Sequence, residues 1–465
     1  MRPRAWLLAA LLVPIGAVAQ AQPSAAPDTA AATPAGPGAT SAAPGSTDAG
    51  AAPADDDPDS NDDLIADYEL GVDGDGAASD DGAASDDGDD TPTTGALRFG
   101  VYTDSDQTSV YRALGVVSSA AGAWAFNGSV GIDAVTSASV DVRSSPDLSA
   151  VDVVTSASGR TSTSGGQMTD NRIQATSGVT WDDSHGRVVS LTGAAATERD
   201  YKSLSANLNG SIDVLDRTTT LLGGVSFTDN WIASVLDRDL HERMYALGWS
   251  LGIARVLTRN DAVRLRYDGD SHEGYQSSPY RNVRFGDWST TTGPRGQIMF
   301  TNTLGPADGM PELEPTSRLR HAATLELLHA LGDHVGLHPQ LRASHDSWGV
   351  TSASAALDLR VAEPTWRLQL GYRYYQQWKA DFFQDKYTAD PSTYTYYTAD
   401  KDLGDVVGHL WNFGVSWVLR EPEGLGSSRL LLDARVDLFR YSYPGFLLLA
   451  ERTSALVQLG LTWEL

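Results

Sequence analysis

The chain alternates between apolar and polar residues with a period of two from about residue 97 to its end. In 457–465 every second residue is apolar, from Val457 through Trp463, and small or polar residues lie between them. The same alternation occurs in 124–132, 204–214, 366–374, 411–419 and 430–438. Successive side chains of a strand point to opposite faces, so the pattern predicts strands with one apolar and one polar face.

Strand length decides between two all-β architectures, a soluble sandwich and an outer-membrane barrel. Many runs last about 11 to 14 residues, whereas strands of globular proteins cluster near 5–6 and a tilted strand needs ~9–11 to cross a bilayer. The polar face also carries charges, at Asp433, Arg435 and Asp437. These charges would be costly in a dry core but are ordinary in a wet lumen.

The predicted connections alternate between short turns and long loops, a pattern that is typical of outer-membrane barrels. Short turns are predicted at 118–120, 182–186 and 421–426, and long loops at 135–171, 272–318 and 377–404, among others. We therefore predict an all-β fold, an antiparallel up-and-down transmembrane β-barrel of about 16 strands (14–18), with both chain ends on the periplasmic side.

The N-terminal part lacks this alternation. Residues 1–21 have the features of a signal peptide: Arg2 and Arg4, a short apolar run, and a small-residue cleavage site at 17–19. Residues 22–96 are rich in Ala, Pro and Asp and have too little apolar surface to fold, which predicts a disordered acidic linker. The expected organisation is thus a cleaved leader, a linker, and an outer-membrane barrel over 97–465.

The amino-acid composition limits the classes of partner and of chemistry that are expected for this protein. The 465 residues carry a net charge of −26 and include no cysteine, which excludes disulfides and thiolate chemistry. No basic stripe marks a nucleic-acid surface. The expected partners are outer-membrane lipid, the barrel-insertion machinery and, through the acidic linker, basic periplasmic proteins. The Asp-Gly repeat of the linker fits no EF-hand spacing, and we predict no cofactor or metal.

Candidate lumen-facing residues are the charged residues at polar positions of the strands. They are Arg264, Arg266, Asp268, Asp270, Arg367, Arg373, Asp433, Arg435 and Asp437. In an open lumen such residues tune ion selectivity, and in a plugged one they form buried pairs. They could equally be solvated wall charges without a specific ligand.

Enzyme signatures are weak. Ser344, His345 and Asp346 are adjacent, so in a strand they point to alternate faces and cannot form a catalytic triad. Four histidines lie within 321–338, but that segment is predicted as strand-turn-strand, where helical metal-ligand spacing loses its meaning. We predict no catalytic site.

Several separated motifs resemble one bacterial family, domain of unknown function 3570. They lie at 102–106, 133–139 with a near-copy at 152–158, 272–281, 314–321, and 372–378 with 380–383. The resemblance runs from about Arg98 to Leu465. It implies an exported, barrel-like protein of Gram-negative bacteria without an established activity. The family is also associated with gene neighbours for flavin attachment and thioredoxin-like proteins, which suggests an envelope redox system.

One family motif lies in the longest predicted external loop and includes Tyr275, Pro279, Tyr280 and Arg281. These residues could bind a ligand, because aromatic rings stack and arginine pairs with anions. Alternatively, the segment folds into the barrel mouth as a rigid constriction, which Gly274 and Pro279 favour. The aromatic stretch 387–397 is expected to form an interface girdle or to pack within a loop.

Three functions follow in order of preference. The first is a porin-like outer-membrane barrel acting as a channel or conduit component of the Gram-negative envelope. The second is a plugged barrel that serves as a scaffold for periplasmic redox or other envelope partners, which bulky inward residues such as Leu431 and Phe439 would favour. An outer-membrane hydrolase comes third.

Overall fold

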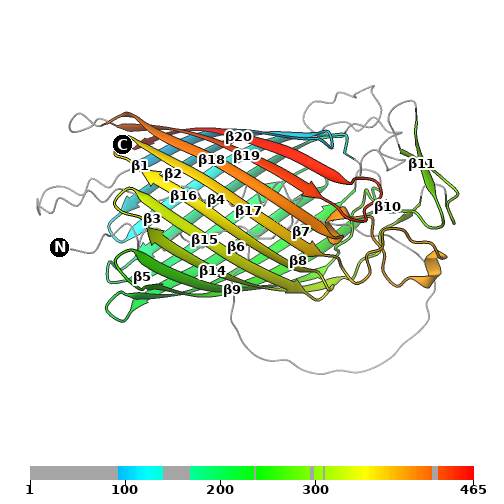
Figure 1. Ribbon diagram of the computed structural model, residues 1–465, viewed down its shortest axis with the longest axis horizontal. Helices are drawn as coiled ribbons and strands as arrows, with labels where there is room; N and C mark the ends of the chain where they lie inside the picture. Colours follow the sequence, from blue (N-terminus) through cyan, green and yellow to red (C-terminus); the bar gives the residue numbers. More distant parts are fainter. Residues whose placement is uncertain are drawn as a thin grey trace, which may run out of the picture.

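A computed structural model describes residues 93–139, 168–234, 237–293, 298–306, 309–421 and 428–464. Sixteen antiparallel strands form one closed barrel, which confirms the predicted fold class and strand number (Figure 1). The barrel closes between its first and last strands, where Thr94 lies opposite Glu464. The first strand begins at Thr93, whereas the sequence pattern placed the start of the barrel at 97. The predicted leader and most of the predicted linker lie outside the described residues.

Each barrel strand pairs with its neighbours in chain order, apart from the step from β9 to β14 across a long loop. The barrel strands are β1 Thr93–Asp104, β2 Thr108–Ala121, β3 Trp124–Ser137, β4 Met168–Asp182, β5 Arg187–Thr197, β6 Tyr201–Val214, β7 Thr219–Ala233, β8 His241–Val256, β9 Asp261–Gly274, β14 Ser317–Ala330, β15 Val335–Asp346, β16 Thr351–Ala362, β17 Trp366–Trp378, β18 Val406–Arg420, β19 Arg429–Ser442 and β20 Glu451–Glu464.

The strands follow the two-residue period of the sequence. Along β6, Leu204 and Leu208 are exposed on the outer face, while Ser205 and Asn207 between them are buried on the inner face. The lengths run from 11 residues in β5 to 16 in β8. Such strands exceed the globular norm and match the length needed to cross a bilayer at a tilt.

The long loops after β9 and β17 lie at one end of the barrel (Figure 1), together with the short turns after β1, β5 and β15. The connections described at the opposite end are all short. The turn between β2 and β3 corrects one prediction. It was expected at 118–120, but β2 continues to Ala121 and the turn is at 122–123, where Gly122 adopts a φ of +58°. Glycine tolerates that conformation and the serines of 118–119 instead pair with β3. The predicted turn at 421–426 and the predicted loop at 135–171 lie largely outside the described residues.

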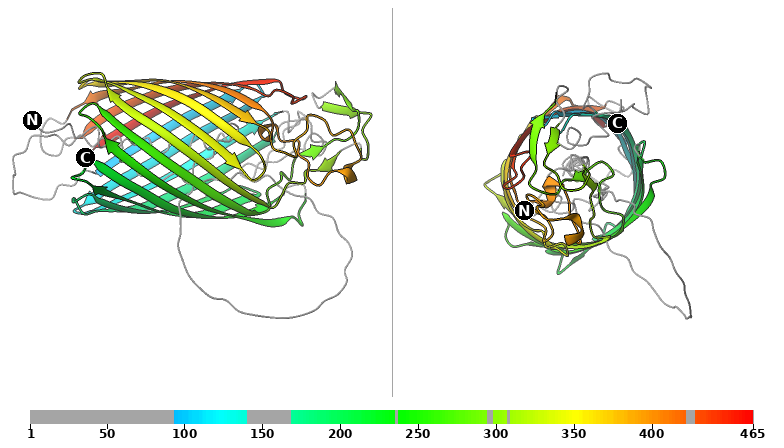
Figure 2. Two further views of the ribbon diagram at one scale, coloured as in Figure 1. Left: turned by 60° about the horizontal axis from the view of Figure 1, so that its bottom comes forward. Right: turned by 90° about the vertical axis from the view of Figure 1, so that its right-hand side faces the viewer.

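The loop between β9 and β14 carries four short strands in two small sheets. They are β10 Asn282–Val283 with β13 Met310–Pro311, and β11 Ser289–Thr292 with β12 Ile298–Thr301. The loop between β17 and β18 carries two 3-10 helices, η1 Pro391–Thr393 and η2 Lys401–Leu403. In the view along the barrel, described segments of both loops lie within the outline of the barrel (Figure 2).

The two loops pack on each other through an aromatic cluster. Phe285 of the first loop contacts the rings of Tyr387, Tyr394 and Tyr397 of the second, with centroids 5.0–5.8 Å apart. Backbone bridges join the same segments, as between Leu313 and Tyr397. The aromatic stretch of 387–397 thus packs within a loop, one of its two expected roles.

A second apolar cluster lies on the inner face where β1 meets β17 to β20. It contains buried Tyr102, Tyr375, Phe439 and Tyr441, among others. Phe439 points inward as expected and is buried against the other members of this cluster. In the described part of the chain, no helix has the length and apolar character that a membrane span requires.

Candidate functional site: the barrel lumen and its mouth

The outer face of the barrel is apolar and is bounded by aromatic residues at both ends. Large exposed side chains such as Phe99, Leu204 and Leu251 cover its middle. At the short-turn end lie the tryptophans Trp124, Trp181, Trp366, Trp417 and Trp463. Toward the loop end lie Tyr245, Tyr267, Tyr372, Tyr374 and Trp411. An apolar band between two aromatic girdles is typical of membrane-spanning barrels.

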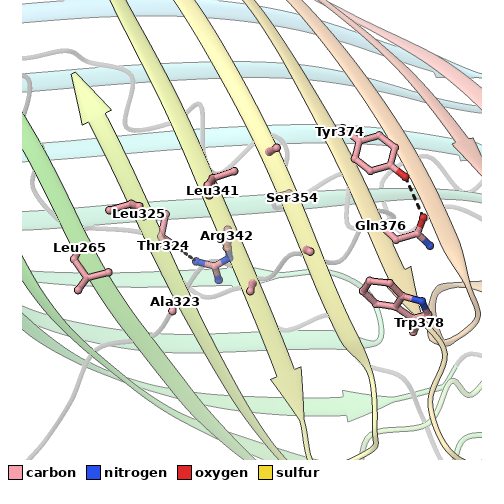
Figure 3. Close-up of a pocket in the computed structure, with 13 residues that line it drawn as sticks. Leu265, Ala323, Thr324, Leu325, Leu341, Arg342, Ser354, Tyr374, Gln376 and Trp378 are labelled. Atoms are coloured by element: carbon pink, nitrogen blue, oxygen red, sulfur yellow. Dashed lines mark hydrogen bonds between the residues drawn. The ribbon is translucent and has the colours of Figure 1, made fainter. Parts of the chain in front are cut away.

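A shallow hollow of about 600 Å³ lies on the wall over β14 to β17 (Figure 3). Small alanines such as Ala323 and Ala343 form its floor, and Leu325, Leu341 and Trp378 rise beside them. Those three larger side chains are 45–56% exposed on the outer face. The hollow therefore opens toward the apolar exterior and is not part of the lumen.

The inner face of β9, β14 and β15 carries several neighbouring ion pairs, which we call the ion-pair wall. It comprises Arg264, Arg266, Asp268, Asp270, Arg320, Glu326 and Arg342. Arg264 Nη2 lies 2.5 Å from Glu326, and Arg266 Nε lies 2.5 Å from Asp268. Asp268 also accepts a bond from Arg342 at 3.3 Å.

Together with Asp268 and Glu326, Asp270 is one of the most enclosed members of this wall. Arg320 Nε donates to it at 2.8 Å, and His272 Nε2 lies 2.8 Å away. The Asp268 and Asp270 carboxylates are nearly inaccessible, so their burial is offset by paired cations. Four of the nine predicted lumen-facing residues thus come together with partners from two other strands.

The other predicted lumen-facing residues lie elsewhere on the inner face. Arg435 Nε donates to buried Asp437 at 2.9 Å. Arg373 lies 5.9 Å from the centroid of the Tyr375 ring. Arg367 is opposite Ser416 on the neighbouring strand, and Asp433 is opposite the same serine from β19.

Sequence reasoning did not name several partners of these charges. Arg320, Glu326 and Arg342 occupy the same alternating polar positions in β14 and β15 and could have been found by that signal. A further inward pair, Arg112 with Asp133, is bidentate at 2.6 and 2.9 Å. Strand register, which sequence alone leaves open, decides which of these charges meet.

The family motif of the first loop contacts other parts of the chain at the barrel mouth. Tyr275 is buried against Tyr201 and Met244. The Tyr280 hydroxyl donates to Asp200 in the turn between β5 and β6. Arg281 pairs with Asp400 of the second loop, and Pro279 lies half-buried before them. The motif thus connects the first loop to the wall and to the second loop.

Glu312 joins the two loops at a fully buried position. Its carboxylate accepts bonds from Ala399 N at 2.7 Å, Thr398 Oγ1 at 2.9 Å and Ser278 N at 3.2 Å. Burial and the neighbouring Glu314 raise the pKa of Glu312 to about 8, although Arg281 at 4.0 Å opposes that shift. Glu312 therefore changes its charge close to physiological pH.

The Asp400 carboxyl beside it behaves differently. Although burial disfavours its charge, the Arg281 guanidinium and the Lys401 ammonium hold the pKa of Asp400 below its usual range. Two carboxyl groups at the contact between the loops are thus pushed in opposite directions. Asp400 stays ionised as the partner of Arg281, while Glu312 is the titrating group.

Three carboxylates meet where β4 begins, beside the β5–β6 turn. Ligand oxygens of Asp170, Glu198 and Asp200 lie within 4.8 Å of one another. Burial and the charge of Asp170 raise the pKa of Asp200 to about 6. Such a group has the chemistry to hold a cation, but Arg172, 3.5 Å from Glu198, and the Tyr280 hydroxyl also contact it. Sequence analysis did not single out this cluster, because its members meet only through strand pairing.

The histidines and the apparent triad do not form a common site. His338 faces inward, 3.2 Å from Glu326, while His321 faces outward with Nδ1 2.7 Å from the Tyr267 hydroxyl. Ser344 bonds to Ser352, and His345 to Thr351. Neighbouring strand positions have separated these groups onto the two faces of the wall.

A closed antiparallel barrel with an apolar exterior and a charged inner face defines the structural class of this protein. Within that class, the chain belongs to the family described as protein of unknown function DUF3570. The family's sequence model matches residues 61–248 and 241–421. The resemblance inferred from the separated motifs is therefore confirmed, and it extends further toward the N-terminus than those motifs.

Solved structures offer distant similarities. A bacterial polysaccharide outer membrane secretin is 10% identical with a TM-score of 0.42, covering 80% of this chain and 98% of the secretin. OprD of Pseudomonas aeruginosa is 9% identical with a TM-score of 0.37, covering 81% and 95% of the two chains. The CymD monoaromatic hydrocarbon channel is 8% identical with a TM-score of 0.35, covering 80% and 87%. A search of curated proteins finds no match.

Proposed function

We propose that this protein is an outer-membrane channel, or the barrel of a conduit, in the envelope of a Gram-negative bacterium. One observation carries the proposal: a closed barrel of 16 strands places charged and polar residues inside and an apolar band outside. Barrels of 16–18 strands are wide enough to enclose an aqueous passage. A wall with this polarity is stable when lipid lies outside and water inside.

The lumen and the mouth would then have separate roles. The ion-pair wall sets the electric field along one side of the passage, and such wall charges select among ions. The two packed loops lie within the outline of the barrel at one end and restrict entry there (Figure 2). The inward cluster around Phe439 narrows the passage further. The expected channel is therefore narrow and selective.

Reversal potentials test the role of the wall. Replacing Arg264 and Arg266 together by glutamine removes two inward positive charges and leaves Glu326 and Asp268 on the wall. The channel should shift toward cation selectivity in a salt gradient. Arg440→Gln is the matched control, because Arg440 is exposed on the outer face and pairs with Glu451 there.

An unchanged reversal potential in the double variant would contradict a conducting lumen at this wall. The same shift in Arg440→Gln would show that the effect does not depend on the inner face. Heat-modifiable gel migration shows whether each variant has folded.

The scaffold alternative predicts a different dependence on the acidic N-terminal region. Deleting residues 22–92 removes every acidic residue before the barrel while leaving every barrel strand intact. A channel should keep its conductance after the deletion. A scaffold should instead lose basic periplasmic partners, measured by co-purification at low salt, where electrostatic attraction is strongest.

A further inference from the structure

Small, uncharged polar side chains occupy the inner face of β6, β7 and β8. We call this group the neutral patch; its members are Ser205, Asn207, Asn209, Ser226, Thr228, Asn230 and Ser250. Their chain neighbours Leu204, Leu208, Phe227 and Leu251 are exposed on the outer face. At the inward positions of 203–209, 224–230 and 246–250 the sequence has no charged residue.

Strand pairing makes the patch continuous. Asn207 lies opposite Ser226, and Asn209 lies opposite Gly224, which in turn lies opposite Ser250. On the next strand Ser250 is opposite Asp268, where the ion-pair wall begins. The inner face therefore changes from neutral to charged between β8 and β9, and the two regions share one lumen.

In four residues of the patch, five side-chain polar atoms lack hydrogen-bond partners within the described part of the chain. These atoms are Nδ2 of Asn207, Nδ2 and Oδ1 of Asn209, Oγ of Ser205 and Oγ of Ser250. All four residues are at most 5% exposed. By contrast, the carboxylates of the adjoining wall are each paired with a cation. Buried polar groups without partners are costly, so a partner from the lumen side would be favoured.

We propose that the neutral patch is a binding subsite for an uncharged, hydroxyl-rich solute, that is, a sugar. Amides and hydroxyls both donate and accept hydrogen bonds, and so do the hydroxyls of a sugar. The patch has no charge to favour an ion and no large apolar side chain to favour an apolar ligand. This inference rests on the proposed channel function and names the class of solute that the channel takes.

Single-channel recording with maltotriose as the probe tests the subsite. Sugar in the lumen should interrupt the ionic current transiently, and the frequency and duration of the interruptions give an affinity. Replacing Asn207 and Asn209 together by alanine removes amide groups on adjacent rungs of β6. We expect about tenfold weaker maltotriose binding in this double variant, as for the loss of two ordinary hydrogen bonds.

Ser416→Ala is the matched control. Ser416 is also a small polar residue at an inward position, but it lies on β18 between Arg367 and Asp433, away from the patch. It should bind maltotriose as the unmodified protein does. Equal affinity in the Asn207/Asn209 variant and the unmodified protein would overturn the subsite, as would a conducting channel that maltotriose never interrupts.

A barrel that folds but carries no ionic current would contradict the proposed channel function. It would leave the sugar subsite to be tested by another method. Calorimetric titration of maltotriose into the folded protein in detergent then decides. Binding that is weakened by the Asn207/Asn209 replacement and retained in Ser416→Ala supports the subsite. Absence of binding to the unmodified protein overturns it.

Discussion

At the scale of single residues, a glycine fixes the point where the first long loop leaves the barrel. Gly274 ends β9 with a φ of +112°, and a Cβ there would meet the Arg243 carbonyl group. Non-glycine residues adopt such a backbone conformation only at a cost. The motif that begins at Tyr275 therefore depends on glycine for its direction.

Replacing Gly274 by alanine should destabilise the folded protein by about 1–3 kcal/mol, because backbone strain and a steric clash act together. The change in the free energy of unfolding is measured by urea titration, with the loss of the heat-modifiable gel form as the readout of unfolding. Gly336→Ala is the control, since Gly336 lies in β15 and has open space around its Cβ position. Equal effects of the two replacements would contradict this account of Gly274.

Alternation in the sequence identified the inward charges of β9, but not which of them would pair. Arg264 and Arg266 were expected to share a face, and they do. Their carboxylate partners differ because Glu326 comes from β14 while Asp268 lies on β9 itself. Which charges pair depends on the strand register and on the length and direction of the side chains. The two-residue period of the sequence does not specify either.

At the scale of elements, the two long loops form one unit whose contact includes a titrating group. Glu312 is buried between them and faces Glu314, Arg281 and Asp400. Its pKa of about 8 lies above the value of 4.5 for an unperturbed glutamate. The folded contact thus favours the protonated form. Its contribution to stability is fully present below about pH 4.5 and is lost as the pH rises from there to about 8.

Hydrogen exchange of residues 309–316 as a function of pH should therefore show the loop contact loosening as the pH rises from about 4.5 to about 8 and levelling off above that, after correction for the intrinsic exchange rate. Glu312→Gln keeps an uncharged side chain of the same shape and should flatten this dependence. Asp287→Asn is the control, because the exposed Asp287 bonds to Lys386 of the other loop at 2.6 Å. A surface pair contributes little, so the pH dependence should remain.

Persistence of the pH dependence in Glu312→Gln would show that another group controls the loop contact. Loss of the pH dependence in Asp287→Asn would point instead to the surface pair between Asp287 and Lys386.

The strands could be predicted from sequence because each one carries its own two-residue period, as in β6 and β20. The loop contact could not, because Phe285 and Tyr387 lie far apart in the chain and no local pattern joins them. They meet only when barrel closure brings both loops to one mouth. The turn at Gly122 was misplaced for a local reason: the serines before it suit a turn as well as a strand.

At the scale of the whole molecule, the polarity of the two faces supports a passage through a membrane. The outer face carries an apolar band between aromatic girdles, and the inner face carries both the ion-pair wall and the neutral patch. A soluble barrel would require the reverse arrangement, with apolar side chains inside. The inward cluster around Phe439 and the packed loops would limit the width of such a passage.

The most direct test of the channel is conductance of the refolded, heat-modifiable protein in a planar lipid bilayer. The account predicts stepwise currents that rise linearly with voltage and are small for a 16-stranded barrel, because the mouth is partly covered. A barrel that inserts in its folded form and carries no current would contradict the channel and favour the plugged scaffold.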